Sequence, residues 1–230
     1  MKLDKSRQNI SSMFDDIAVR YDFLNHFFTA NLDKRWRRKI VKYITENNIR
    51  SEVIVDLASG TGDMAIELLD LNPIKVYALD ISPKMLDVLR KKNKDERMVI
   101  EVAESEHMPL ENQSADIVTI AFGIRNFEST ENSLKEIYRI LRPDGMLIVL
   151  EMFNLEKRNR LFEFYFTRIM PVLGKVISRS STAYSYLHNS VMNFKTVKQF
   201  IELSAKHGFV HEYHKNNFQK FVYSVYLRKL

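Results

Sequence analysis

The sequence contains no cysteine, one tryptophan, six glycines and five prolines among its 230 residues. The absence of cysteine excludes disulfides, thiolate metal sites and cysteine nucleophiles, and it fits a reducing compartment. No run approaches the roughly 18 uninterrupted apolar residues of a membrane-spanning helix. The first residues, MKLDKSRQNISSMFDD, lack the apolar core of a signal peptide. We therefore expect a soluble, cytoplasmic chain.

Charge is distributed unevenly, although the net charge is only +6. Residues 1–50 carry a net charge of +5, residues 51–150 carry −7 and residues 151–230 carry +8. Basic segments bind nucleic-acid phosphates or anionic lipid headgroups, or they only keep a chain soluble. The distribution by itself leaves these three interpretations open.

The middle of the chain alternates between two apolar patterns. Short runs rich in branched residues (EVIVDLA, KVYALDIS, MVIEVAES, ADIVTIAF, GMLIVLEMF) are separated by the helical patterns MAIELLDL, PKMLDVLRKK and ENSLKEIYRILR. This order predicts an α/β fold with a Rossmann-like, doubly wound parallel sheet. The strands are nearly continuous in Val, Ile and Leu, so we expect helices on both faces.

The length, and the lack of repeats or a Pro/Gly/Ser-rich linker, predict a single domain with appendages. Residues 1–50 are expected to form a helical N-terminal lid, and residues 51–153 a cofactor-binding core. Residues 154–195, which are unusually aromatic, predict a helical insertion on the substrate side. Residues 196–230 predict a helix ended by Gly208 and then two strands, antiparallel at the sheet edge.

The stretch VIVDLASGTGD predicts a ligand-binding turn after the first strand. Glycine permits a left-handed backbone and close approach of a ligand, which favours Gly60 and Gly62 as its floor. A dinucleotide fingerprint needs a third glycine where this chain has Ala65. Asp56 lies on the turn, and Asp63 opens the next helix, where carboxylates repel a diphosphate and suit a cation. Because S-adenosylmethionine carries a sulfonium and an ammonium, the turn favours it over NAD.

Two further loops at the same edge of the sheet carry polar residues. Asp80 ends the second predicted strand, where an acid accepts hydrogen bonds from ribose hydroxyls. Glu104 and Ser105 follow the third strand and are expected beside the adenine. An ordinary capping acid and turn glycines are the alternative interpretation of these residues, and we predict no metal site.

The fourth predicted strand opens onto AFGIRNF, which brings Arg125 and Asn126 to the same crevice as substrate contacts. Arg125 is a permanent cation with a planar fork of donors, able to steady a phenolate or hold a water. A structural salt bridge to a nearby acid is the alternative for Arg125.

The chain resembles the menaquinone/ubiquinone biosynthesis C-methyltransferases, the demethylmenaquinone methyltransferase group, to about residue 210. The resemblance rests on MFDDIAVRYDFLNHFFT, DLASGTGD, AESEHMPLENQSADIVTIAFGIRNF, EIYRILRPDGMLIVLEMF and TAYSYLHNSV. It implies a class I S-adenosylmethionine-dependent methyltransferase, with Thr61, Asp80, Glu104 and Ser105 as cofactor contacts. The chain departs from the family where Glu104 replaces a more usual Asn or Asp, where Ala121 replaces a serine, and in its C-terminal strand.

The resemblance implies transfer of a methyl group to a ring carbon of demethylmenaquinol, which carries a polyprenyl tail. The carbon must be electron-rich, so the quinol should react, preferably as its phenolate. Arg125 and Asn126, with Tyr21 from the N-terminal helices, are the expected catalytic residues. Tyr184 is a further contributor to the lid. His26 and His188 are candidate proton carriers, but a single histidine on a helix is more often a surface or packing residue, so we assign neither of them a role.

Polyprenyl substrates reside in the bilayer, so the basic ends are expected to bring the chain to an anionic membrane surface, peripheral to the inner face of the cell membrane. A homodimer is a further possibility.

A nucleic-acid methyltransferase is disfavoured because no Asn-Pro-Pro-aromatic motif follows the fourth strand. A dinucleotide oxidoreductase is disfavoured by Asp63 and the missing third glycine. Two hypotheses stay open beside quinol methylation: a methyltransferase for another small aromatic or lipid, and a non-catalytic S-adenosylmethionine-binding subunit of a quinone-synthesis complex.

Overall fold

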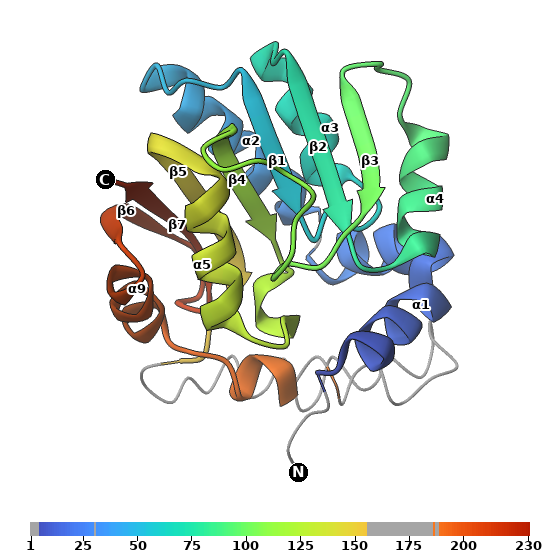
Figure 1. The fold of residues 1–230 in the computed structure, drawn as a ribbon. Coiled ribbons are helices and arrows are strands. Elements are labelled where there is room, and N and C mark those ends of the chain that lie inside the picture. Colours follow the sequence, from blue (N-terminus) through green and yellow to red (C-terminus); the bar gives the residue numbers. More distant parts are fainter. Residues whose placement is uncertain (1–4, 30, 156–185, 187–188) are drawn as a thin grey trace.

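A seven-stranded sheet forms the centre of the computed structural model, which describes residues 5–29, 31–155, 186 and 189–230 (Figure 1). The strands are β1 (Val53–Leu57), β2 (Lys75–Asp80), β3 (Met98–Val102), β4 (Ala115–Ala121), β5 (Leu141–Met152), β6 (Phe209–Phe218) and β7 (Val222–Lys229). Their order is β3-β2-β1-β4-β5-β7-β6. The first five strands are parallel, and β7 runs antiparallel to both β5 and β6. This confirms the predicted doubly wound sheet with antiparallel C-terminal strands.

Helices cover both faces of the sheet, with α5 in front and α2 and α3 behind in Figure 1. The α-helices are α1 (Arg7–Phe28), α2 (Leu32–Glu46), α3 (Asp63–Leu68), α4 (Pro83–Lys92), α5 (Thr130–Ile140) and α9 (Val197–Lys206), and the 3-10 helices are η1 (Leu69–Leu71) and η2 (Ile124–Asn126). Neighbouring strand residues point to opposite faces. Val55 packs in a cluster with α5 and α9, whereas Ile54 packs in a cluster with α2 and α3. Two apolar layers therefore hold the parallel strands.

Helix α1 crosses the carboxyl ends of the parallel strands (Figure 1). Polar contacts help to hold it there, beside the buried apolar side chains of Ile10 and Ala18. Ser11 Oγ donates to the carbonyl of Ile81 at 3.1 Å, and Ser82 Oγ donates to Asp15 at 2.6 Å. Of the segment 1–50 that was expected to be a lid, α1 thus lies over the loops that follow β1 to β4, whereas α2 packs on a face of the sheet.

The division of the chain at residues 50, 153 and 195 remains a prediction. Most of the expected insertion, residues 154–195, lies outside the described residues. In the part of the chain that the structure describes, no helix is both long and apolar enough to cross a membrane.

Candidate functional site

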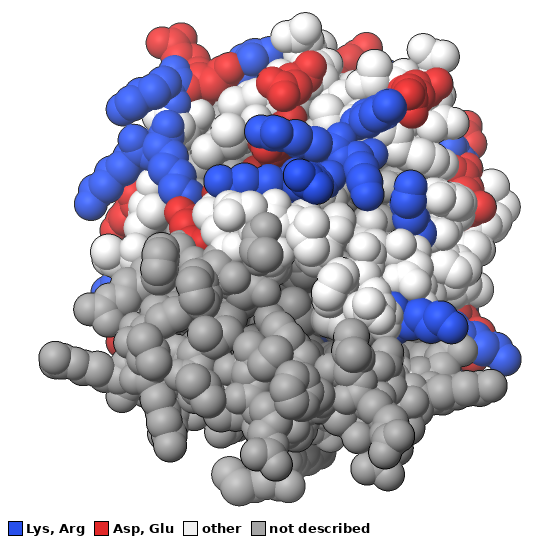
Figure 2. Space-filling model, turned by 180° about the vertical axis from the view of Figure 1, so that it is seen from behind, with Lys and Arg blue, Asp and Glu red and all other residues white. Residues whose placement is uncertain are grey.

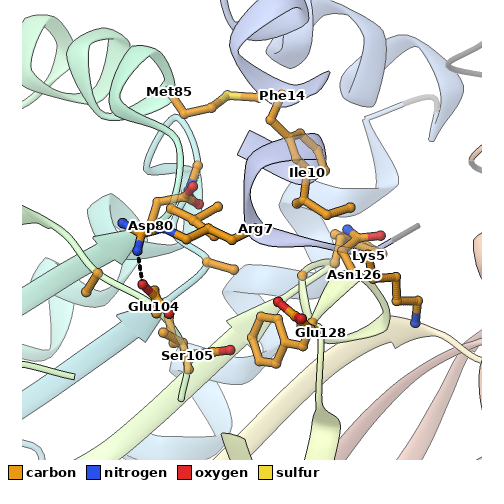
Figure 3. Close-up of a pocket in the computed structure, with 18 of the residues that line it drawn as sticks. Lys5, Arg7, Ile10, Phe14, Asp80, Met85, Glu104, Ser105, Asn126 and Glu128 are labelled. Atoms are coloured by element: carbon orange, nitrogen blue, oxygen red, sulfur yellow. Dashed lines mark hydrogen bonds and ion pairs between the residues drawn. The ribbon is translucent and has the colours of Figure 1, made fainter. Parts of the chain in front are cut away.

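A pocket with about 800 Å³ of empty space, part of it open to solvent, lies between α1 and the loops that follow β1 to β4 (Figure 3). Parallel sheets commonly bind ligands at the carboxyl ends of their strands, where these loops lie. Of the predicted site residues, the structure places Tyr21, Gly60, Asp80, Glu104, Ser105 and Asn126 on its walls. The four predicted residues that do not line it are Asp56, Thr61, Gly62 and Arg125.

Asp80 connects the two loops at the floor of the pocket. One carboxylate oxygen accepts the backbone N–H of Gly60 at 2.8 Å, and the other accepts that of Ser82 at 2.8 Å. Burial raises the pKa of Asp80 to about 6, although these two N–H groups act in the opposite direction. The glycine turn and the loop after β2 are thus held together by one carboxylate that also faces the pocket.

Gly60 and Gly62 both have left-handed backbones, with φ angles of +56° and +86°. Their surroundings differ. A Cβ atom at Gly60 would lie 4.0 Å from Cε1 of Tyr21, on the pocket side, whereas one at Gly62 would lie 2.0 Å from Cδ1 of Leu89. Gly60 therefore leaves open space at the pocket wall, and Gly62 allows close packing of α4 beneath the turn.

Asp56 lies inside β1 and not on the turn, which corrects the position expected from the sequence. It is paired in register with Ala78 and Thr119 and is almost fully buried. Its Oδ1 accepts a hydrogen bond from Thr119 Oγ1 at 2.7 Å, and burial raises its pKa to about 6. In this structure Asp56 supports the turn from below.

A polar network ties α1 to the glycine turn. Thr61 donates to Asp22 of α1, and Asp22 also forms an ion pair with Lys92 of α4. Lys92 reaches Asp63 at 3.2 Å, at the first residue of α3. Thr61 therefore holds α1 against the turn and does not lie on the pocket wall.

His26, Asp33 and Asp63 form a further cluster whose polar atoms have the spacing of metal ligands. The guanidinium of Arg37 lies 2.7 Å from Asp33 and 3.4 Å from Asp63. Because Arg37 pairs with both carboxylates and Lys92 also pairs with Asp63, we assign no metal to this cluster.

Glu104 and Ser105 lie on the pocket wall after β3, where they were expected. Arg7 of α1 forms an ion pair with Glu104, shown as a dashed line in Figure 3. Ser105 Oγ shares a 2.8 Å hydrogen bond with Ser133 Oγ of α5. Helix α1 thus closes over this side of the pocket through Arg7.

Arg125 is buried beneath the pocket wall. Its Nη1 contacts Glu151 Oε1 at 2.5 Å and the carbonyl of Phe122 at 2.7 Å. Glu151 is fully buried in β5, and burial raises its pKa while the charge of Arg125 lowers it. The structure therefore agrees with the salt-bridge alternative for Arg125. The next residue, Asn126, reaches the pocket.

Four functional candidates escaped sequence reasoning: Lys5, Arg7, Glu151 and Tyr186. The hydroxyl of Tyr186 donates to Asn126 Oδ1 at 3.0 Å, and burial raises the pKa of Tyr186 to about 12. Only Glu151 gave a signal in the sequence, as an acid within the apolar run GMLIVLEMF. The predicted candidates Tyr184 and His188 lie outside the described residues.

The pocket wall carries more acidic than basic side chains. Its charged residues are Lys5, Arg7, Asp80, Glu104, Glu106 and Glu128. A negative, partly desolvated wall favours a cationic ligand and disfavours a diphosphate. This excess of carboxylates on the wall fits a ligand that carries a sulfonium and an ammonium.

Comparisons with known proteins agree with this chemistry. The model of the ubiE/COQ5 methyltransferase family matches residues 1–225. The chain is 39% identical over 216 residues to the ubiquinone/menaquinone biosynthesis C-methyltransferase UbiE of Geotalea uraniireducens, covering 90% of this chain and 91% of that protein. It is 35% identical over 209 residues to the demethylmenaquinone methyltransferase of Thermotoga maritima, covering 89% and 90%. A SAM-dependent methyltransferase structure from Aquifex aeolicus has the same fold, with a TM-score of 0.59, 15% identity and coverage of 82% and 88%.

Proposed function

The chain belongs to the ubiE/COQ5 methyltransferase family, and from this premise we propose that it methylates a ring carbon of demethylmenaquinol to give menaquinol. It has the class I, Rossmann-like methyltransferase fold and depends on S-adenosylmethionine. The observation that carries the proposal is the pocket itself, with acids on the side of β2 and β3 and Asn126 on the side of β4 (Figure 3).

The residues of the pocket would divide the work between two ligands. Asp80 and the backbone at Gly60 would hold the methyl donor, with Glu104 and Ser105 beside it. When bound, S-adenosylmethionine supplies a sulfonium methyl group, whose carbon–sulfur bond breaks as an electron pair of the ring carbon forms the new carbon–carbon bond. Tyr21 and Asn126 would position the acceptor ring, and α1 would exclude water.

Quinone analysis of cells tests this proposal. Cells that lack the chain should accumulate a demethylated naphthoquinone, and a plasmid copy should restore the methylated form. A copy that carries Asp80→Asn should fail to restore it while accumulating as folded protein. Unchanged quinones in the deletion strain would refute the proposal and favour a methyltransferase with another small acceptor.

We also propose that the chain associates with an anionic membrane surface, where a polyprenyl acceptor resides. Figure 2 shows Lys and Arg side chains gathered across the middle of the rear face, where α2 lies. The exposed cations of α2 are Lys34, Arg35, Arg38, Lys39 and Lys42. Their spacing puts them on one side of the helix, opposite buried Trp36 and Ile40. Each such charge contributes about 1 kcal/mol of attraction to anionic lipid.

Vesicle sedimentation tests the membrane proposal. At low salt the chain should sediment with vesicles that contain phosphatidylglycerol and not with phosphatidylcholine vesicles. The variant Lys34→Glu/Arg35→Glu/Lys39→Glu should lose this binding, whereas Lys84→Glu/Lys91→Glu/Lys94→Glu, with the same change of charge, should retain most of it. Equal losses in both variants would contradict a specific role of α2.

A homodimer remains a prediction. The outer strand β6 has two register shifts against β7 and an exposed Lys215, features that disfavour pairing between sheet edges. A dimer would therefore use another surface, and sedimentation equilibrium would measure its mass.

A further inference from the structure

The two sides of the pocket differ in charge. Asp80 and Glu104 lie on one side together with Arg7, and Lys5, Asn126 and Glu128 lie across the pocket from them (Figure 3). Asp80 and Glu104 suit the cationic methyl donor. The opposite side is therefore left for the acceptor.

Lys5 immediately precedes α1 and is half-buried on the pocket wall. Its Nζ donates a 2.6 Å hydrogen bond to the backbone carbonyl of Arg125, next to Asn126. An ammonium has three donors, so this contact leaves two for a ligand. Among the described residues, no carboxylate forms an ion pair with Lys5, whereas Arg125 is paired with Glu151.

The charged groups around Lys5 leave an excess of positive charge. Arg125 and Lys195 are its cationic neighbours, and Glu151 is the acidic neighbour. Arg7 and Glu128 are the other charged groups on the nearby wall, and Arg7 is paired with Glu104. Burial, and then the charges of Lys195 and Arg125, lower the pKa of Lys5. An anion placed at Lys5 would relieve this repulsion.

We propose that Lys5 binds the ionised oxygen of the aromatic acceptor, so that the pocket takes the acceptor as an oxyanion. This inference rests on the proposed methylation of a quinol. The negative charge of the oxyanion is delocalised onto the ring carbon that attacks the methyl group. Transfer then cancels the charges of donor and acceptor, and the proton on the methylated carbon leaves to water, which restores the aromatic quinolate. Lys5 acts before transfer by keeping the acceptor ionised at neutral pH.

The pH dependence of methyl transfer tests Lys5. A neighbouring cation lowers the pKa of an acidic hydroxyl by about 1 unit or more, and 1 unit corresponds to about tenfold in the ionised fraction. Anaerobic kcat/KM for reduced demethylmenaquinone should therefore be about tenfold lower in Lys5→Met at pH 7. The deficit should shrink as the pH rises to 9, because the free quinol then ionises without help. Lys5→Arg should restore most of the rate, and the exposed control Lys206→Met should match the wild type in detergent.

A second measurement does not depend on turnover. The probe 1-naphthol is a redox-stable analogue of the quinol whose neutral and ionised forms absorb differently. Titrated with S-adenosylhomocysteine present, naphthol bound to the wild type should ionise at a pH about 1 unit lower than naphthol bound to Lys5→Met. The affinity of both proteins for S-adenosylhomocysteine, measured by calorimetry, should agree within about twofold.

The outcomes separate this inference from the function on which it rests. A wild type that binds S-adenosylmethionine but does not methylate the quinol refutes the proposed function. The role of Lys5 is refuted if the wild type methylates the quinol and Lys5→Met is either unchanged or slowed by the same factor at every pH. In that case Lys5 would only hold the N-terminal segment against Arg125.

Discussion

Alanine substitution of the two turn glycines separates ligand binding from packing. In Gly62→Ala, the left-handed backbone costs about 1 kcal/mol, and the new methyl group would lie 2.0, 2.8 and 2.9 Å from three side-chain carbons of Leu89. Overpacking of this kind costs about 2 kcal/mol more. We therefore expect about 3 kcal/mol of destabilisation, which lowers Tm by about 6 to 12 °C in a chain of this length.

Gly60→Ala should behave differently. Its left-handed backbone also costs about 1 kcal/mol, but the new methyl group meets no heavy atom nearer than 4.0 Å. Tm should fall by about 2 to 4 °C. Because Gly60 lines the pocket, the methyl group should hinder the methyl donor, and the affinity for S-adenosylmethionine should fall at least about tenfold.

Differential scanning calorimetry and isothermal titration calorimetry on both variants measure these effects. A Gly60→Ala variant that binds S-adenosylmethionine as well as the wild type would refute the reasoning about the pocket wall. A Gly62→Ala variant no less stable than Gly60→Ala would refute the reasoning about Leu89.

Three further variants test the buried charges. Asp80→Asn keeps the side-chain size but cannot accept both backbone N–H groups, so we expect at least about tenfold weaker S-adenosylmethionine binding by calorimetry; unchanged binding would contradict the role of Asp80. Burial raises the pKa of Asp56 to about 6 from 3.8, so its stabilising contribution is present below pH 4 and is lost as the pH rises through 6. Asp56→Asn resembles the protonated form, so its unfolding free energy, measured by urea titration, should fall less than that of the wild type between pH 5 and 7. An equal fall of the unfolding free energy with pH in both proteins would count against this assignment. Glu151→Gln leaves Arg125 buried without its counter-ion and should lose about 3 kcal/mol in the same assay, whereas a loss below about 1 kcal/mol would show that the ion pair matters little.

The sequence predicted the features that depend on local pattern. Runs of branched apolar residues located the parallel strands, and Asp80 ends β2 as expected. Gly208 follows α9 with a φ angle of +90°, in agreement with the predicted end of that helix. These features were predictable because periodicity, glycine and strand ends act over a few residues.

The contacts that the sequence could not predict join distant parts of the chain. Asp56 looked like a turn residue, but its partner Thr119 lies 63 residues away on β4. A salt bridge was one of the two interpretations of Arg125, but nothing near it in sequence indicated that Glu151, 26 residues later, is the partner. Lys5 reaches the pocket through a contact with Arg125 that spans 120 residues. Only the packed sheet and α1 bring these groups together.

The most direct test of the central claim is methyl transfer by the purified chain. S-adenosylmethionine labelled in its methyl group is incubated anaerobically with demethylmenaquinone, either chemically reduced or left oxidised, and the products are separated by chromatography. The account predicts labelled menaquinol and one equivalent of S-adenosylhomocysteine from the reduced acceptor, and no product from the oxidised one. No labelled product from the reduced acceptor, in protein that binds S-adenosylmethionine, would contradict it.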